Sequence, residues 1–225
     1  MGYHISTGLI LEKFKEPCEC PLCAIRKKVE ENFLHEFLND AVMEDSTRLK
    51  VNAKGFCDKH FDMLFKRQNK LSLALQIGSR TDELLPLFKT PKSVKAAKKL
   101  SNKLIESTKT CIICDLVDES MEKYYKTIAQ MFNKEKNFAE KIKNTKGFCL
   151  HHYAKLLEYS GYAGLKSKDY LKLLSETEKE KFSELKADLK AFCDKHDYRN
   201  AYTPLGNAEN ALPRMRVKLY GEKRN

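Results

Sequence analysis

The sequence predicts an all-α protein built from two tandem helical repeats that pack into one body. The first observation is composition: 225 residues include only 9 Gly, and long stretches are rich in Lys, Glu, Leu and Ala, which lose little on entering a helix. The second is a Cys/His pattern that occurs twice, with 92 positions between Cys57 and Cys149. A duplication of this period is typical of two similar halves packed together.

The repeated pattern is a C-x-x-C pair followed, after 34 or 35 positions, by a C-x-x-H pair. Each C-x-x-H pair directly follows the tripeptide Lys-Gly-Phe. The eight candidate metal ligands are Cys20, Cys23, Cys57 and His60 in the first copy and Cys111, Cys114, Cys149 and His152 in the second. Because the two copies match so closely in spacing, we interpret these residues as metal ligands and not as ordinary buried cysteines.

We expect each copy to bind one zinc ion, giving two per chain. Three thiolates and one imidazole suit tetrahedral zinc, and every pair lies at a predicted helix start, whose positive end favours a cluster of net charge −1. Zinc would then join two helices of the same repeat. An iron–sulfur cluster fits less well, because no cluster fingerprint has this long spacing. The sequence favours positions outside the sites for Cys18, His151, Cys193 and His196 but leaves their part in metal binding open.

The predicted organisation has five parts: a lead-in, a first metal-binding repeat, a basic linker helix, a second metal-binding repeat and a C-terminal arm, over residues 1–17, 18–88, 89–109, 110–196 and 197–225. In the first repeat, Val29, Phe33 and Phe37 recur at helical spacing and predict a helix over 24–43. A second helix is expected over 58–77, directly after the C-x-x-H cysteine.

The linker is the most basic part of the chain, with seven Lys and the single acid Glu106 over 88–109. Pro91 can start a helix there, and we expect its apolar residues, such as Val94 and Ile105, to face inward. The outer face would then carry Lys92, Lys95, Lys99 and Lys103. This face is either a solvated surface or a site for anions.

In the second repeat, five apolar residues recur at spacings of 4, 3, 4 and 3, and these are Val117, Met121, Tyr124, Ile128 and Met131. They predict the buried stripe of a helix. The glycines over 160–164 should interrupt the helix that follows Cys149, and a long amphipathic helix is expected over 175–196. Pro, Gly and Asn in the arm suit an extended segment with a short basic helix near 214–220.

The overall charge and hydropathy narrow the class of protein. The formal net charge is +11, which favours general attraction to polyanions over sequence-specific reading of nucleic acid, since the basic residues are mostly Lys. No run of 18 apolar residues exists, so we expect no membrane partner. Residues 1–17 have no secretory pattern, so we expect a cytoplasmic protein with reduced cysteines.

The sequence contains no metalloprotease, serine-hydrolase, phosphate-loop or dinucleotide-binding motif, and a four-ligand zinc site leaves no open position for substrate. It therefore favours a protein without catalytic residues. We expect a zinc-binding helical scaffold or adaptor with an unknown protein partner. Two alternatives stay open: a nucleic-acid-associated basic zinc protein, and a redox sensor whose zinc thiolates react with oxidants.

The repeated pairing of C-P-L-C with a downstream G-F-C-x-x-H resembles an uncharacterised family of bacterial proteins, mostly from Firmicutes, that carries a domain of unknown function. The resemblance would cover nearly the whole chain, including Asp-Tyr-Arg-Asn at 197–200. The second C-x-x-C pair departs from it, with Ile112 where the first has Pro21. The resemblance implies a helical, cytoplasmic, metal-binding protein and no particular activity.

Overall fold

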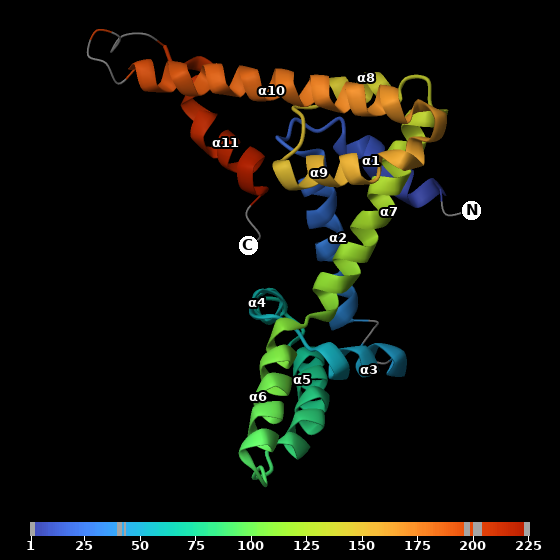
Figure 1. Cartoon of the computed structure of the whole chain (residues 1–225), viewed down its shortest axis with the longest axis vertical. Coiled ribbons are helices and arrows are strands. Elements are labelled where there is room, and N and C mark those ends of the chain that lie inside the picture. The colour runs from blue at the N-terminus through green and yellow to red at the C-terminus, as the bar shows by residue number, and fades with distance from the viewer. Residues whose placement is uncertain (1–2, 40–41, 43, 196–198, 200–203, 223–225) are drawn as a thin grey trace. The chain divides into compact units, whose positions relative to one another are not determined.

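The computed structural model describes the chain except for residues 1–2, 40–41, 43, 196–198, 200–203 and 223–225. Its described part contains eleven α-helices, several short 3-10 helices and no strand, which confirms the all-α fold class (Figure 1). No helix in that part is both long and apolar enough to cross a membrane. The α-helices are α1 (Tyr3–Lys13), α2 (Pro21–Leu38), α3 (Asp45–Lys54), α4 (Asp58–Phe65), α5 (Lys70–Leu84), α6 (Val94–Lys109), α7 (Ile112–Lys134), α8 (Phe138–Lys143), α9 (Leu150–Glu158), α10 (Ser167–Lys195) and α11 (Ala211–Tyr220).

The chain divides into two compact units. Unit 1 consists of Met1–Lys27 and Met121–Arg224, and unit 2 of Lys28–Ser120. The boundaries fall inside α2 and α7. Each of these helices therefore has one end in unit 1 and the other end in unit 2. Each unit therefore combines segments from both copies of the Cys/His pattern, unlike the predicted repeats over 18–88 and 110–196.

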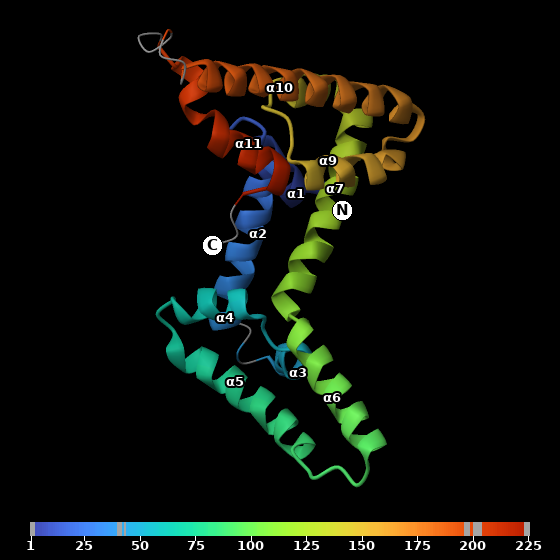
Figure 2. The ribbon, with the colours of Figure 1, turned by 60° about the vertical axis from the view of Figure 1, so that its left-hand side comes forward.

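Unit 1 is organised around α10, the longest helix. It packs against α8, α9 and α11 and against the 3-10 helices η3 (Ser160–Lys166) and η5 (Gly206–Asn210) (Figures 1 and 2). The Phe14 ring of the N-terminal segment lies 5.6 Å from that of Phe138 and 6.1 Å from that of Phe148. These buried aromatic contacts join segments that are far apart in sequence into one core.

Most of the predicted elements of unit 1 are present. Four of the five stripe residues of α7 are buried, including Val117 in the part of α7 that belongs to unit 2, while Tyr124 is half-buried. The predicted interruption contains Gly164, whose φ of +59° breaks the helical path before α10. The long helix starts earlier than predicted, at Ser167, and α11 corresponds to the short helix predicted near 214–220.

In unit 2, the single helix predicted over 58–77 is wrong, because the structure has α4 and α5 there. The Asn69 side chain accepts a hydrogen bond from the Ser72 backbone N–H and so caps a new helix. The Asn69 amide also donates to the Leu38 carbonyl at 2.6 Å, at the end of α2. The helix predicted over 24–43 therefore ends earlier, at Leu38.

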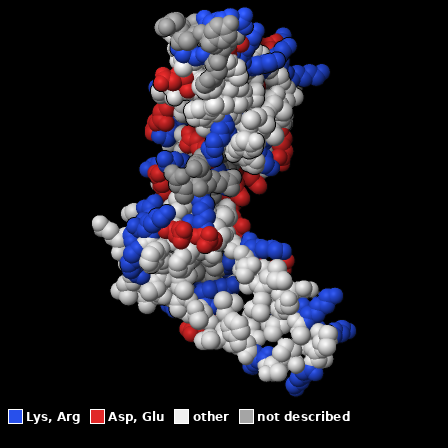
Figure 3. Space-filling model, turned by 90° about the vertical axis from the view of Figure 1, so that its left-hand side faces the viewer, with Lys and Arg blue, Asp and Glu red and all other residues white. Residues whose placement is uncertain are grey.

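Helix α6 departs most from expectation. None of its residues is buried, and Val94 and Ile105 are 88% and 50% exposed. The prediction that its apolar residues face inward is therefore wrong. Helices α4 and α3 pack against α5, whereas α6 keeps Val94 and Ile105 exposed and only half-buries Leu100 and Leu104. In the space-filling view, the surface of α5 and α6 shows Lys and Arg side chains among largely uncharged residues (Figure 3).

Candidate metal centres

The structure gathers all eight predicted ligands into two groups but exchanges their pairing. The His152 centre consists of Cys20, Cys23, Cys149 and His152, and the His60 centre consists of Cys57, His60, Cys111 and Cys114. In each group the four donor atoms lie within 4.8 Å of one another, so each group could hold a metal ion. The prediction that each copy of the pattern forms its own site is wrong: either C-x-x-C pair meets the C-x-x-H pair of the other copy.

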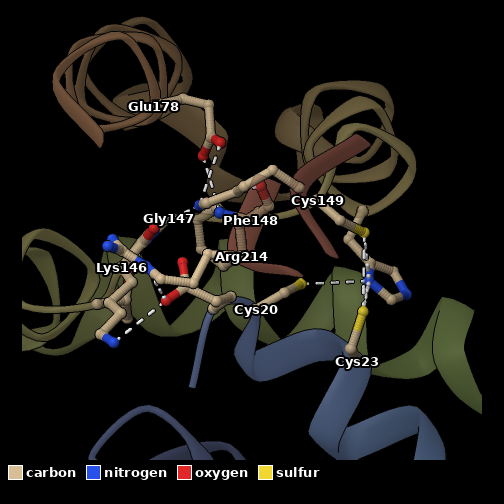
Figure 4. Close-up of polar contacts among 12 residues, drawn as sticks. Cys20, Cys23, Lys146, Gly147, Phe148, Cys149, Glu178 and Arg214 are labelled. Atoms are coloured by element: carbon tan, nitrogen blue, oxygen red, sulfur yellow. Dashed lines mark hydrogen bonds and ion pairs between the residues drawn. The ribbon is translucent and has the colours of Figure 1, made fainter. Parts of the chain in front are cut away.

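The His152 centre lies wholly within unit 1 and is buried. The Nδ1 atom of His152 lies 3.4 Å from the Sγ atoms of Cys20 and Cys23 and 3.2 Å from that of Cys149. The sulfurs of Cys23 and Cys149 are 3.8 Å apart. None of the four side chains is more than 7% exposed, and the three labelled cysteines converge on one ring nitrogen, the Nδ1 atom (Figure 4). The arrangement is a compact set of three sulfurs and one nitrogen.

The His60 centre lies wholly within unit 2 and has the same arrangement. The Nδ1 atom of His60 is 3.3 Å from Cys57 Sγ, 3.2 Å from Cys111 Sγ and 3.4 Å from Cys114 Sγ. Its sulfurs are more accessible, since Cys57 and Cys114 are only half-buried. The two centres therefore share a ligand set but differ in exposure.

In both centres the Cys and His residues lie at or directly before the N-terminus of a helix. Cys57 and Cys149 are the N-cap residues of α4 and α9, and the histidine follows three positions later in the first helical turn. Cys20 and Cys111 stand directly before α2 and α7. Two helix N-termini thus point their partial positive charge at each thiolate group, which favours the ionised sulfurs.

Local contacts explain the exchange of pairs. In unit 2, the Ile112 N–H donates to the Gly55 carbonyl at 3.1 Å, and the Thr110 hydroxyl donates to the Lys54 carbonyl at 2.6 Å. Lys54 also forms an ion pair with Asp115. These contacts hold the loop before Cys57 against the start of α7. Cys57 therefore lies within reach of Cys111 and Cys114.

Unit 1 has a corresponding contact. Glu19, directly before Cys20, accepts hydrogen bonds from Lys146 at 3.1 Å and from Arg214 at 2.9 Å (Figure 4). Arg214 in turn donates to Asp188 on α10 at 2.7 Å. The start of α2 is thereby held against the loop that leads to Cys149.

A buried ion pair supports that loop from behind. Glu178 on α10 accepts from the Phe148 N–H at 2.8 Å, and the Lys218 ammonium donates to the carbonyls of Lys146 and Phe148 (Figure 4). The Lys218 Nζ atom lies 3.6 Å from Glu178 Oε1, and both side chains are buried. Burial raises the pKa of Glu178, while the positive charge of Lys218 opposes that rise. Sequence reasoning missed both residues, because nothing marks two residues so distant from the motif.

The His60 centre has a different support. The Nε2 atom of His60 lies 2.9 Å from a carboxylate oxygen of Glu30, and the Lys59 ammonium donates to the same oxygen at 2.6 Å. Burial opposes ionisation of Glu30, but these hydrogen bonds outweigh it and lower the pKa of the carboxyl group to about 2. Glu30 therefore stays ionised beside His60. Sequence reasoning also missed Glu30, although its place two helical turns after Cys23 puts it on the same side of α2.

The remaining Cys and His residues lie outside both groups where the structure describes them. Cys18 is half-buried, and burial raises the pKa of its thiol. Cys193 is exposed near the end of α10. His151 is exposed, with its ring 5.3 Å from that of His152. His196 lies outside the described residues.

Comparison with known proteins places the chain in a family without assigning an activity. Residues 1–225 match the model of a family described as "Family of unknown function (DUF6062)", and the chain belongs to that family. The chain is 23% identical over 193 residues, 86% of its length, to an "Uncharacterized 23.9 kDa protein in xynA 3'region" from Caldicellulosiruptor sp. (strain Rt8B.4), of which the match covers 89%. No solved structure matches the chain. The resemblance to an uncharacterised family is therefore confirmed.

Proposed function

We propose that this member of the family is a zinc-binding helical scaffold with one structural zinc ion in each compact unit. The observation that carries the proposal is the convergence of three sulfurs and one imidazole nitrogen within 4.8 Å in both groups. Two sulfurs bound to one tetrahedral zinc at about 2.3 Å would lie about 3.8 Å apart. The observed sulfur separations of 3.8 Å in the His152 centre and 3.9 Å in the His60 centre agree with that value.

A structural role fits better than a catalytic one. Four protein donors complete a tetrahedral zinc shell and leave no position for water or substrate. A bound zinc ion would supply cross-linking: Cys23 and Cys149 are 126 positions apart, and Cys57 and Cys114 are 57 apart. Joining such distant segments removes much conformational freedom from the unfolded chain. The proposal also places the protein in the cytoplasm, where the cysteines stay reduced.

Metal content tests the proposal directly. Protein purified without a metal-affinity tag or chelator should carry two zinc ions per chain in native mass spectrometry. Iron with visible colour would favour a redox cluster, and fully reduced protein that binds no metal would show that the cysteines are core residues only.

The proposed scaffold would bind a protein partner through α6. This helix has no fully buried residue and exposes the apolar side chains of Val94 and Ile105, and exposed lysines lie on it or directly before it at Lys92, Lys95, Lys99 and Lys103. Apolar side chains such as Val94 gain from being covered by another protein, and the lysines favour an acidic one. These features support a binding module over an enzyme.

Association with nucleic acid is a second candidate that the same lysines favour. Binding would then fall steeply with salt, because each phosphate contact releases a counterion. A variant with all four lysines changed to Glu should fold normally, since these side chains are exposed. If it binds duplex DNA and RNA as the wild type does, with an unchanged salt slope, α6 is not a nucleic-acid surface.

A redox sensor is the third candidate. Cys57 and Cys114 are accessible enough for small oxidants, and oxidised sulfurs no longer hold zinc. Mild peroxide would then release the ion of the His60 centre reversibly. Cysteines that stay unmodified in the native protein under such treatment would exclude this role.

A further inference from the structure

The two centres share a ligand set but hold their histidines differently. We propose, building on the zinc-binding function above, that Glu30 is a positioning residue for His60, so that the His60 centre binds zinc more tightly and the His152 centre holds the exchangeable ion.

The imidazole of His60 is fixed at both nitrogens. Its Nδ1 atom faces the three sulfurs, and its Nε2 atom lies 2.9 Å from the Glu30 carboxylate. A ligand that gives Nδ1 to the metal must carry its proton on Nε2, and Glu30 accepts that proton in a hydrogen bond. Glu30 is itself 8% exposed and is held by Lys59 at 2.6 Å. The hydrogen bond to Glu30 therefore fixes the ring orientation and favours the tautomer that leaves Nδ1 free for a metal.

His152 has no such support. Its Nδ1 atom faces the sulfurs in the same way, but its Nε2 atom is buried without a hydrogen-bond partner among the residues that the structure describes. At the matching positions of the two copies, Glu30 stands seven positions after Cys23 and Met121 stands seven positions after Cys114. Met121 is 1% exposed, and its thioether is only a weak acceptor.

This difference is large enough to separate the affinities. Removing a partner of a ligating histidine typically lowers metal affinity 10–100-fold. When His152 binds zinc through Nδ1, it must keep a buried N–H without an acceptor, which is unfavourable. Exposure works in the opposite direction, because Cys57 and Cys114 are half-buried whereas all four ligands of the His152 centre are buried. The order of metal loss therefore tells which effect dominates.

The experiment is a chelator competition on the two-zinc protein, sampled at equilibrium. Newly freed cysteines are alkylated with N-ethylmaleimide and located by peptide mass spectrometry. We expect Cys20, Cys23 and Cys149 to be labelled at chelator concentrations 10–100-fold below those that free the cysteines of the His60 centre. If the cysteines of the His60 centre are freed first, or both sets together, the inference is overturned.

Variants assign the difference to Glu30. Glu30→Met leaves Nε2 of His60 without its carboxylate acceptor and should lower the zinc affinity of the His60 centre 10–100-fold, leaving the other centre unchanged. Glu31→Met is the matched control, because it removes the same charge from the next position of α2 and should change neither centre. An unchanged affinity in Glu30→Met would refute the role of Glu30.

The readouts separate this inference from the proposed function. A wild-type protein that binds no zinc would refute the function itself, whereas two ions of equal affinity would refute only the difference between centres. If Glu30→Met does not fold, Glu30→Gln keeps the volume and an acceptor but removes the charge. It should give an affinity between those of the wild type and an unsupported histidine, and an affinity equal to the wild type would show that the carboxylate charge is not needed.

Discussion

Gly147 offers the sharpest test of how the His152 centre is built. Gly147 and Gly55 hold the same place in the two Lys-Gly-Phe-Cys segments, with φ angles of +81° and +65°. A Cβ at Gly147 would lie 2.7 Å from the Lys218 ammonium nitrogen and 2.8 Å from a Glu178 carboxylate oxygen. A Cβ at Gly55 would meet only Arg80, at 3.5 Å. Alanine is therefore strained at both positions but collides only at Gly147.

The matched pair of variants isolates that collision. Backbone strain of about 1–3 kcal/mol applies to both Gly147→Ala and Gly55→Ala. At Gly147 the buried Lys218 and Glu178 side chains must also move, which weakens their hydrogen bonds to the loop. Outright loss of one partner of a buried pair costs about 3–5 kcal/mol. The pair is displaced and not removed. We therefore expect Gly147→Ala to lower the free energy of unfolding of its unit by about 2–3 kcal/mol more than Gly55→Ala lowers that of the other unit.

Hydrogen–deuterium exchange on the zinc-loaded protein measures this difference, because amides of unit 1 and unit 2 report separately on the opening free energy of each unit. Gly147→Ala should lower protection in unit 1, and Gly55→Ala should lower it less in unit 2. If the loss in unit 1 does not exceed the loss in unit 2, the buried pair does not support the Cys149 loop as described.

Three further predictions concern the metal. His60→Ala and His152→Ala should each lose about one zinc equivalent and unfold at lower temperature, and either variant keeping two ions at full stability would disprove its ligand assignment. The exchanged pairing predicts different zinc contents for two double variants. Cys20→Ser combined with Cys149→Ser should leave one centre intact, whereas Cys20→Ser combined with Cys57→Ser should damage both centres. Equal zinc content in the two double variants would contradict the pairing. Lowering the pH should release zinc as the thiolates become protonated, with loss of thermal stability in step, and metal retained in strong acid would exclude thiolate ligation.

Local features of the chain were sufficient to predict most of the helices and the eight Cys and His residues that the two groups contain. The i, i+3 spacing of Cys57 and His60 places both side chains on one side of a helix start, whatever the rest of the chain does. The stripe that begins at Val117 is buried as its period predicts. The break between α4 and α5 was missed, because the Asn69 cap competes with a helical pattern that continues across it.

By itself, the sequence determined which eight Cys and His residues form the two groups that could hold a metal ion and that these residues lie at helix starts, because both properties depend on neighbours a few positions apart. Only the tertiary structure decided which pairs meet. The two C-x-x-H pairs have the same chemistry, so their choice of partner depends on contacts such as Glu19 with Lys146, which lie 127 positions apart. The difference between the histidines was decided in the same way, since Glu30 acts on His60 only after folding brings α2 to α4.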